Sequence, residues 1–218
     1  MLKHIPNLLT GLRLVLAFVF FAMLSRYQYE RLGDLTFLNI ALVLYVVALI
    51  TDFFDGYLAR KWKAEGVFGR ITDPFVDKVL VLGSFIFFAA KNFVIPLPNP
   101  EDIPSNVLTI TGVTPWMVVI LLARELLVTT FRGAGGKSGQ FGAQFSGKVK
   151  MTLQSITILV ILVFVNFHGR LTEMGYETMA MRVRNIFIWS TVIVTVYSGL
   201  LYVGKIVAVY RAEPSKDE

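Results

Sequence analysis

The stretch LTFLNIALVLYVVALITDFFDGYL, from Leu35 to Leu58, decides the fold. Most of it is an apolar run long enough to cross the hydrocarbon core of a membrane, which takes about 20 helical residues. Near its end the run contains two carboxylates, Asp52 and Asp55. A charged side chain inside a span costs roughly 2.5–3.5 kcal/mol even on a lenient scale. The stretch therefore predicts a membrane-spanning helix whose acidic end has a function.

Five more apolar blocks have a similar length. With the first block they give these predicted spans, with ends defined to within several residues: Leu8–Leu24, Leu35–Leu58, Pro74–Ala90, Pro115–Phe131, Lys150–Phe167 and Ile186–Tyr210. The composition agrees, because 55% of the 218 residues are hydrophobic and the mean hydropathy is +0.64. Since no linker divides the chain, the sequence predicts an all-α membrane protein: one domain over residues 1–218, built as a six-transmembrane-helix bundle.

The N-terminal residues predict a retained first span. Ile5-Pro6-Asn7 suits a helix start, and the apolar block that follows has no small-residue cleavage site. We therefore expect no cleavable signal peptide, and an N-terminal interfacial helix that leads into the bundle.

Basic residues predict the orientation, because cytoplasmic loops are enriched in Lys and Arg. Twelve of the 21 lie on the side of the two termini, and six lie on the other side, among them Arg170 and Arg184 in the last connection. Three fall within spans: Arg13, Lys78 and Arg124. Both termini are predicted to be cytoplasmic, in an inner (cytoplasmic) membrane.

Charge and composition also exclude several classes of function. The net charge of +6 gathers on the cytoplasmic face, where it suits anionic lipid headgroups and phosphorylated metabolites. Nucleic acid is not expected as a partner, because the basic residues are interleaved with spans and form no known module. The chain has no cysteine and two isolated histidines, so it carries no thiolate metal site. The external loop 92–114 is predicted to be a solvated connector without chemistry.

Four aspartates meet at the cytoplasmic edge of the second and third spans. Asp52 and Asp55 are three residues apart, and Asp73 and Asp77 are four apart, so each pair lies on one helix face. The connection between the spans is short, which makes the two helices antiparallel neighbours. All four carboxylates are therefore expected to converge near the cytoplasmic surface.

Converging carboxylates need compensating charge. Two ionised carboxylates about 4 Å apart repel by roughly 4 kcal/mol at an effective dielectric near 20. Oxygen ligands without Cys or His favour Mg2+ or Mn2+, and two such ions suit phosphoryl chemistry. Small residues beside the acids, Gly56, Ala59 and Gly69, allow a flat ligand to approach the backbone, and Arg60 follows at once. A nucleotide diphosphate fits this combination.

The run Asp52-x2-Asp55-Gly56-x2-Ala59-Arg60-x8-Gly69-x3-Asp73-x3-Asp77 resembles, at every specified position, the signature of the CDP-alcohol phosphotransferase family. The resemblance implies six transmembrane helices, a cytosolic active site, a pair of bound metal ions and a homodimer. It implies that all four aspartates bind metal and that Asp77 is also the base that deprotonates the acceptor alcohol. It places Gly56, Ala59 and Gly69 around the cytidine and Arg60 at the diphosphate.

Looser likenesses concern the acceptor. The segments Ile5 to Arg13, Ala123-Arg124-Glu125 and Gly147-Lys148-Val149-Lys150 are similar to those of bacterial phosphatidylglycerophosphate synthases. They favour phosphatidyl transfer from CDP-diacylglycerol to glycerol 3-phosphate, which gives phosphatidylglycerophosphate and CMP. The acceptor phosphate is then expected to meet cations on the cytoplasmic side of the bundle: Arg124, Arg132, Lys148 and Lys150. Inositol phosphate, phosphatidylglycerol and serine stay open as other acceptors.

Structural interpretations stand beside these functional ones. An alternative for Arg124 and Glu125 is a buried ion pair that orients the fourth span instead of contacting substrate. An alternative for Lys148 and Lys150 is that they are ordinary flanking residues at the cytoplasmic membrane edge. A third set, Asn7, Thr10 and Arg13, either contacts substrate or caps and anchors an interfacial helix. A membrane carrier is the rival from another class, although carriers place their coupling acids near the midplane rather than at one edge.

Overall fold

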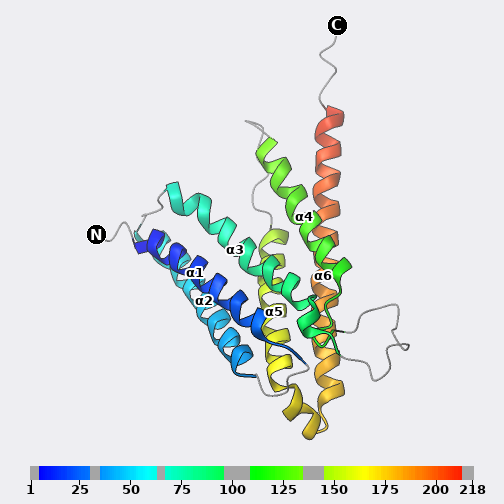
Figure 1. Cartoon of the computed structure of the whole chain (residues 1–218). Helices are drawn as coiled ribbons and strands as arrows, with labels where there is room; N and C mark the ends of the chain where they lie inside the picture. The colour runs from blue at the N-terminus through cyan, green and yellow to red at the C-terminus, as the bar shows by residue number, and fades with distance from the viewer. Residues whose placement is uncertain (1–4, 30–34, 63–66, 96–108, 135–144, 213–218) are drawn as a thin grey trace.

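The computed structural model describes the backbone of residues 5–29, 35–62, 67–95, 109–134 and 145–212, and the side chains of 11–29, 35–52, 75–95, 109–130 and 149–204. These residues form an all-helical fold (Figure 1). Its elements are α1 (Ile5–Arg26), α2 (Leu35–Trp62), α3 (Val67–Phe88), the short 3-10 helix η2 (Lys91–Phe93), α4 (Pro115–Ala134), α5 (Phe145–Glu173) and α6 (Glu177–Ala212). Each predicted span corresponds to one α-helix, which confirms the all-α prediction.

Three of these helices contain stretches long and apolar enough to cross a membrane. The stretches are Leu35–Asp52 of α2, Val149–Glu173 of α5 and Glu177–Gly204 of α6. Large apolar side chains are exposed on outer faces of the helices, for example Phe18, Val43 and Leu200. An apolar outer surface of this kind suits contact with lipid rather than water.

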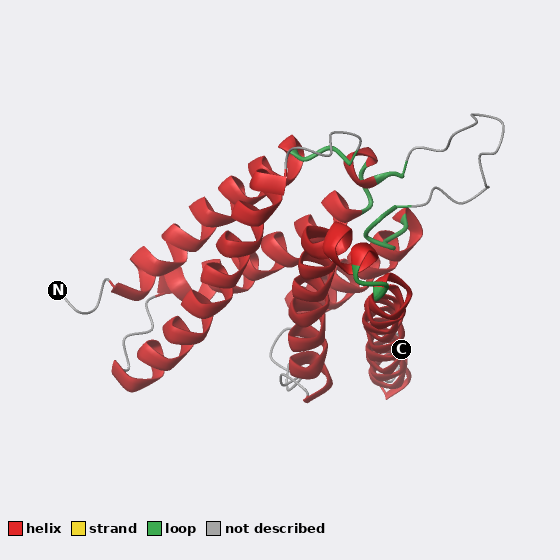
Figure 2. Ribbon diagram, turned by 90° about the horizontal axis from the view of Figure 1, so that it is seen from below, coloured by secondary structure: helices red, strands yellow, loops and turns green. Residues whose placement is uncertain are grey.

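The helices pack as two groups. One group consists of α1 with α2 and α3, and the other of α6 with α4 and α5. Contacts of α2 with α5, and of α3 with α4 and α5, join the two groups (Figure 1). From below, the helix that leads to the C-terminus is seen almost end-on, whereas the helix that follows the N-terminus lies obliquely (Figure 2). The end of α2 and the start of α3 lie together at one end of the molecule, which is where the acidic signature falls.

The core between the helices is aromatic and aliphatic. Phe20, Tyr45, Phe85 and Ile161 are fully or almost fully buried in it. Burial of such side chains contributes roughly 1.5–3 kcal/mol each. This packing fixes α1 against α2 and α3, and it thereby positions the acidic ends of α2 and α3.

The connection between the last two helices is a tight turn, not the longer external loop that the predicted spans left between residues 167 and 186. Gly175 has φ +74°, the left-handed conformation that glycine adopts without strain. The Tyr176 N–H donates to the Leu171 carbonyl at 2.9 Å, and the Gly175 N–H donates to the Thr172 carbonyl at 3.0 Å. This Schellman pattern ends α5, and α6 starts directly afterwards. Arg170 and Arg184 therefore lie on helices.

The prediction of a solvated connector over 92–114 is wrong for the parts of it that the structure describes. Phe93 and Thr111 are fully buried. The Ile110 N–H donates to the Phe93 carbonyl at 2.8 Å, and the Thr111 hydroxyl donates to the Phe88 carbonyl at 2.6 Å. From α6, the Arg184 guanidinium donates to the Ile110 carbonyl and lies 4.7 Å from the centre of the Phe164 ring. These contacts tie the C-terminal end of α3 to the N-terminal part of α6, at the end of the molecule away from the aspartates.

Candidate active site

Arg13 of α1 joins the first and the last aspartate of the signature. Its Nη1 atom lies 2.7 Å from Asp52 Oδ1 in the second half of α2 and 3.0 Å from Asp77 Oδ1 near the middle of α3. Arg13 is only 1% exposed, because α1 packs against both helices. The two carboxylates therefore share one guanidinium nitrogen, and their Oδ1 atoms lie no farther apart than the sum of the two distances.

The remaining residues of the signature lie outside the described side chains. They are Asp55, Gly56, Ala59, Arg60, Gly69 and Asp73. Their backbone is helical, since α2 continues to Trp62 and α3 begins at Val67. The spacings of three and four residues therefore do fall on helices, which is the condition that places each aspartate pair on one face. The roles of these side chains stay predictions.

The described part of this acidic site fits a divalent cation. Within the described side chains no group of three possible ligands gathers, because only two of the four aspartates are included. Asp52 and Asp77 supply hard carboxylate oxygens that converge on one positively charged group. Their side chains are 52% and 24% exposed, so solvent and ligands reach them. Such oxygens suit Mg2+ or Mn2+, which commonly keep bound waters.

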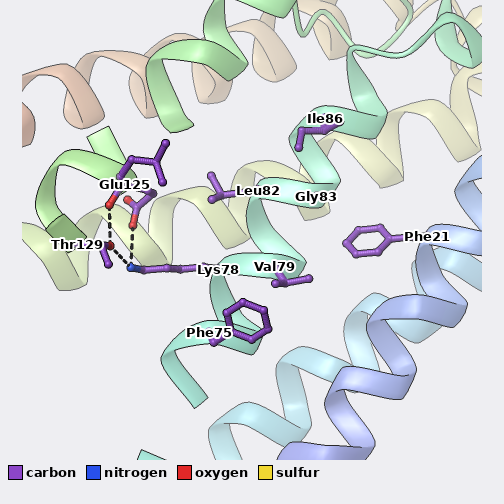
Figure 3. A pocket seen from close by; sticks show the side chains of 10 residues that line it. Phe21, Phe75, Lys78, Val79, Leu82, Gly83, Ile86, Glu125 and Thr129 are labelled. Carbon is purple, nitrogen blue, oxygen red and sulfur yellow. Dashed lines mark hydrogen bonds and ion pairs between the residues drawn. The ribbon is translucent and has the colours of Figure 1, made fainter. Parts of the chain in front are cut away.

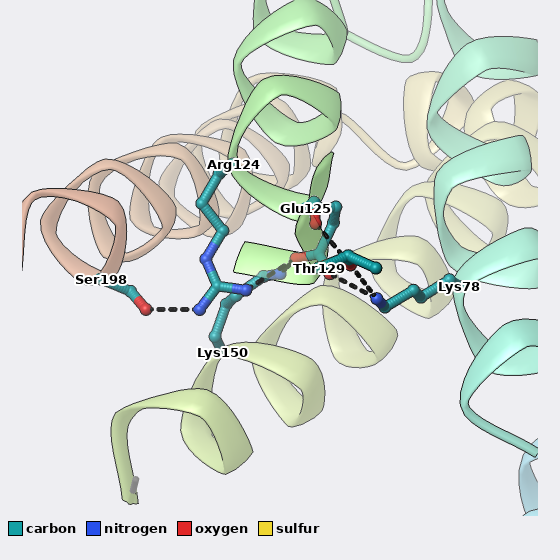
Figure 4. Close-up of polar contacts among 6 residues, drawn as sticks. All are labelled: Lys78, Arg124, Glu125, Thr129, Lys150 and Ser198. Carbon is teal, nitrogen blue, oxygen red and sulfur yellow. Dashed lines mark hydrogen bonds and ion pairs between the residues drawn. The ribbon is translucent and has the colours of Figure 1, made fainter. Parts of the chain in front are cut away.

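A second charged group, the Glu125 cluster, consists of Lys78, Arg124, Glu125 and Lys150 and comes from three helices (Figure 4). Glu125 of α4 is 9% exposed. Its Oε1 atom pairs with Lys150 Nζ of α5 and lies 2.9 Å from Arg124 Nη1, while its Oε2 atom lies 3.9 Å from Lys78 Nζ of α3. One carboxylate thus holds three cationic side chains around it.

Neighbouring groups hold the cations of the Glu125 cluster in position. Lys78 Nζ donates to the Thr129 hydroxyl at 2.6 Å, and that hydroxyl donates to the Glu125 carbonyl at 2.7 Å. Arg124 Nη2 donates to the Ser198 hydroxyl of α6 at 2.7 Å (Figure 4). A Cβ atom at Gly199 would lie 3.3 Å from Arg124 Cγ, so glycine leaves room there for the arginine stem.

An apolar groove begins at the Glu125 cluster and runs along α3 between α1 and α4 (Figure 3). It has a volume of about 560 Å³. Lys78, Glu125 and Thr129 line one part of it, and the rest is mostly aliphatic and aromatic, for example Leu82 and Ile86. The groove therefore combines a polar end with a long apolar part.

The structure assigns positions to several predicted site residues. Arg124 and Lys150 come together at Glu125, so the buried ion pair expected from sequence exists. Lys150 is 2% exposed and Arg13 is 1% exposed, which fits neither a residue that flanks the membrane edge nor an interfacial anchor. The side chains of four other candidates lie outside the described set: Asn7, Thr10, Arg132 and Lys148.

Four residues of this region were not predicted as site residues: Lys78, Glu125, Thr129 and Ser198. Lys78 follows Asp77 directly, and Thr129 lies one helical turn after Glu125, so spacing could have indicated both. Ser198 is 74 residues away from its partner Arg124, and no local pattern indicates it.

Comparison with known proteins defines the class. The family model for CDP-alcohol phosphatidyltransferase matches residues 3–197, and the chain belongs to this family. Members of the family generally depend on divalent metal ions. The acidic site and the Glu125 cluster both lie within the matched residues.

Individual relatives carry a more specific name. The chain is 29% identical over 209 residues to a protein of Bacillus subtilis named CDP-diacylglycerol–glycerol-3-phosphate 3-phosphatidyltransferase, covering 93% of this chain and 94% of that protein. It is 32% identical over 161 residues to a protein of the same name from Cereibacter sphaeroides, covering 72% of this chain and 62% of that protein. A third protein of this name, from Pectobacterium atrosepticum, is 30% identical over 162 residues, 73% of this chain and 76% of that protein.

Proposed function

We propose that this chain transfers the phosphatidyl group of CDP-diacylglycerol to a hydroxyl of glycerol 3-phosphate, which gives phosphatidylglycerophosphate and CMP in phospholipid biosynthesis. The name that its relatives share supports this reaction. The observation that carries the acceptor assignment is the position of Asp77 and Lys78 in the structure. These consecutive residues of α3 contact two different groups, the acidic site through Arg13 and the Glu125 cluster.

This arrangement suits an alcohol that also carries a phosphate. A general base must lie within hydrogen-bond reach of the hydroxyl that it deprotonates, and Asp77 is the candidate base. The phosphate needs several convergent cations, and Lys78, Arg124 and Lys150 provide them. Serine lacks such a phosphate, so these convergent cations favour a phosphorylated acceptor over serine.

The reaction is a direct displacement. Asp77 accepts the proton of the acceptor hydroxyl, and the hydroxyl oxygen forms a bond to the phosphorus of the phosphatidyl group. The bond from that phosphorus to the oxygen of the CMP phosphate breaks, and CMP leaves with the electron pair. Two Mg2+ or Mn2+ ions, held by Asp52, Asp55, Asp73 and Asp77, would stabilise the negative charge that develops on the phosphoryl oxygens.

The remaining predicted contacts complete this site. Gly56, Ala59 and Gly69 line the cytidine pocket, and Arg60 meets the diphosphate. The apolar groove along α3 offers a place for part of the lipid donor beside the Glu125 cluster. All six helices span the inner membrane with both termini and the active site on the cytoplasmic side, and two copies of the chain form a homodimer.

The test is a comparison of acceptors. Detergent-purified protein receives CDP-diacylglycerol with glycerol 3-phosphate, inositol 1-phosphate, serine or phosphatidylglycerol in separate reactions, and CMP release is measured with Mg2+, with Mn2+ and with EDTA. We expect metal-dependent CMP release with glycerol 3-phosphate above all. Preference for another acceptor would reassign the substrate, and transport without CMP release would make the protein a carrier.

Asp77→Asn tests the base. General-base catalysis typically contributes about 10²- to 10⁴-fold, so turnover should fall by that amount in protein that still inserts and melts normally. Turnover close to that of the unmodified enzyme would remove Asp77 from this role.

A further inference from the structure

We infer that Glu125 is an internal substitute for the acceptor phosphate: its carboxylate holds the three cations of the Glu125 cluster until the phosphate displaces it, and it thereby sets the affinity for the acceptor. This inference rests on the proposed function. It assigns to Glu125 a specificity-determining role that neither its charge nor the sequence pattern indicates by itself.

The geometry resembles that of a bound anion. Lys78, Arg124 and Lys150 lie on α3, α4 and α5, and each has a nitrogen atom at ion-pair distance from a carboxylate oxygen of Glu125 (Figure 4). A purely structural ion pair needs one cation, whereas three cations around one anion are typical of a phosphate site. The carboxylate occupies the place at which these cations converge.

The contacts of Glu125 also differ in strength. Lys150 and Arg124 both contact Oε1 closely, but Lys78 Nζ lies 3.9 Å from Oε2 and donates its short bond to Thr129 instead. The Lys78 contact is therefore the looser one, and it lies on the side of the apolar groove, where Lys78 and Glu125 both line the cavity (Figure 3). A phosphate that competes with the carboxylate would therefore take over the Lys78 contact most easily and then compete for Arg124 and Lys150.

Competition between Glu125 and phosphate predicts that replacing Glu125 strengthens acceptor binding. Replacing a residue that supports a binding site weakens binding, whereas replacing an internal competitor strengthens it. Glu125→Gln keeps the size of the side chain and removes its charge. We expect the KM for glycerol 3-phosphate and the Ki for inorganic phosphate to fall by roughly tenfold to hundredfold, the scale of one charged contact. The KM for CDP-diacylglycerol should change less than the KM for glycerol 3-phosphate, because the groove proposed for the lipid is mostly apolar and Glu125 lines only part of it.

The experiment compares Glu125→Gln with Glu173→Gln, the same change at an exposed position near the end of α5. Glu125→Asp is a second variant, because the shorter side chain keeps the negative charge but withdraws it from the cations. The KM for glycerol 3-phosphate should fall less in this variant than in Glu125→Gln. An unchanged or higher KM for glycerol 3-phosphate in folded Glu125→Gln protein would show that Glu125 only supports the cations and would overturn the inference. A shift confined to the KM for CDP-diacylglycerol would overturn it too, because the cluster would then meet the donor diphosphate.

A binding measurement separates this inference from the proposed function. Inorganic phosphate should raise the melting temperature of the Glu125→Gln protein more than that of the unmodified protein, and this readout needs no turnover. If the unmodified enzyme does not use glycerol 3-phosphate, the proposed acceptor fails while the phosphate shift still tests Glu125. An equal or smaller shift in the variant would contradict the role of Glu125 whatever the acceptor is.

Discussion

Replacing Lys150 by methionine removes one of the three cations of the Glu125 cluster and keeps most of the side-chain volume. Lys150 is 2% exposed, so no water takes over the contact that its ammonium group makes with Glu125. A hydrogen bond to a charged group contributes about 1.5–3 kcal/mol. If the acceptor phosphate binds Lys150, this loss corresponds to a rise of roughly tenfold to hundredfold in the KM for glycerol 3-phosphate.

The assay is steady-state CMP release at saturating CDP-diacylglycerol with varied glycerol 3-phosphate. The KM for CDP-diacylglycerol is an internal reference and should change little. Lys91→Met makes the same change at an exposed residue of η2, at the other end of the molecule, and should leave both constants unaltered. Glu125 keeps Arg124 and Lys78 as partners in the Lys150→Met protein, so the protein should still fold. A folded variant with an unaltered KM for glycerol 3-phosphate would refute the assignment of Lys150 to the acceptor.

Three further outcomes are expected. Arg13→Gln removes the positive charge shared by Asp52 and Asp77. The rise in melting temperature on going from EDTA to Mn2+ should therefore be larger for this variant than for the unmodified protein. An equal rise in both proteins would contradict the role of Arg13 as the counter-charge of the two aspartates. Gly83→Ala puts a Cβ atom 2.3 Å from the Phe21 ring and should destabilise the protein by about 1–3 kcal/mol in thermal melts, with partial recovery in a double variant that also has Phe21→Leu. Gly112 has φ +73°, and a Cβ atom added there would lie 3.0 Å from Arg184 Nε. Gly112→Ala should therefore lower the melting temperature through about 1–2 kcal/mol of backbone strain, while the KM values for both substrates stay unaltered.

The sequence was sufficient to predict the helices and the proximity of Asp52 on α2 to Asp77 on α3. Apolar blocks of spanning length and residue spacings of three and four are local properties, and helix periodicity turns them directly into faces. The ends of the helices were less predictable. Polar residues between the fifth and sixth spans suggested a loop, but the described chain has only a short turn there, 174–176, with Gly175 in the left-handed conformation. The order in 109–114 depends on hydrogen bonds to the end of α3, which no local pattern reveals.

The contacts of the site were predictable only in part. That Arg13 lies close to the aspartates follows from the packing of α1 on α3, and the contact spans 64 residues of sequence. Arg124 and Lys150 were candidate phosphate ligands because of their charge and their predicted side of the membrane. Their convergence on Glu125 depends on how α4 and α5 meet, which the sequence does not specify.

The hydrogen bond from Arg124 to Ser198 joins the Glu125 cluster to α6, the longest helix described. A bilayer whose thickness does not match the apolar length of a helix makes that helix tilt. A tilt of α6 would move the Ser198 hydroxyl relative to the Arg124 guanidinium, and hydrophobic mismatch would then act on a cation of the Glu125 cluster. The rate of headgroup synthesis in this enzyme would then respond to the thickness of the surrounding bilayer, the very material that its product helps to build.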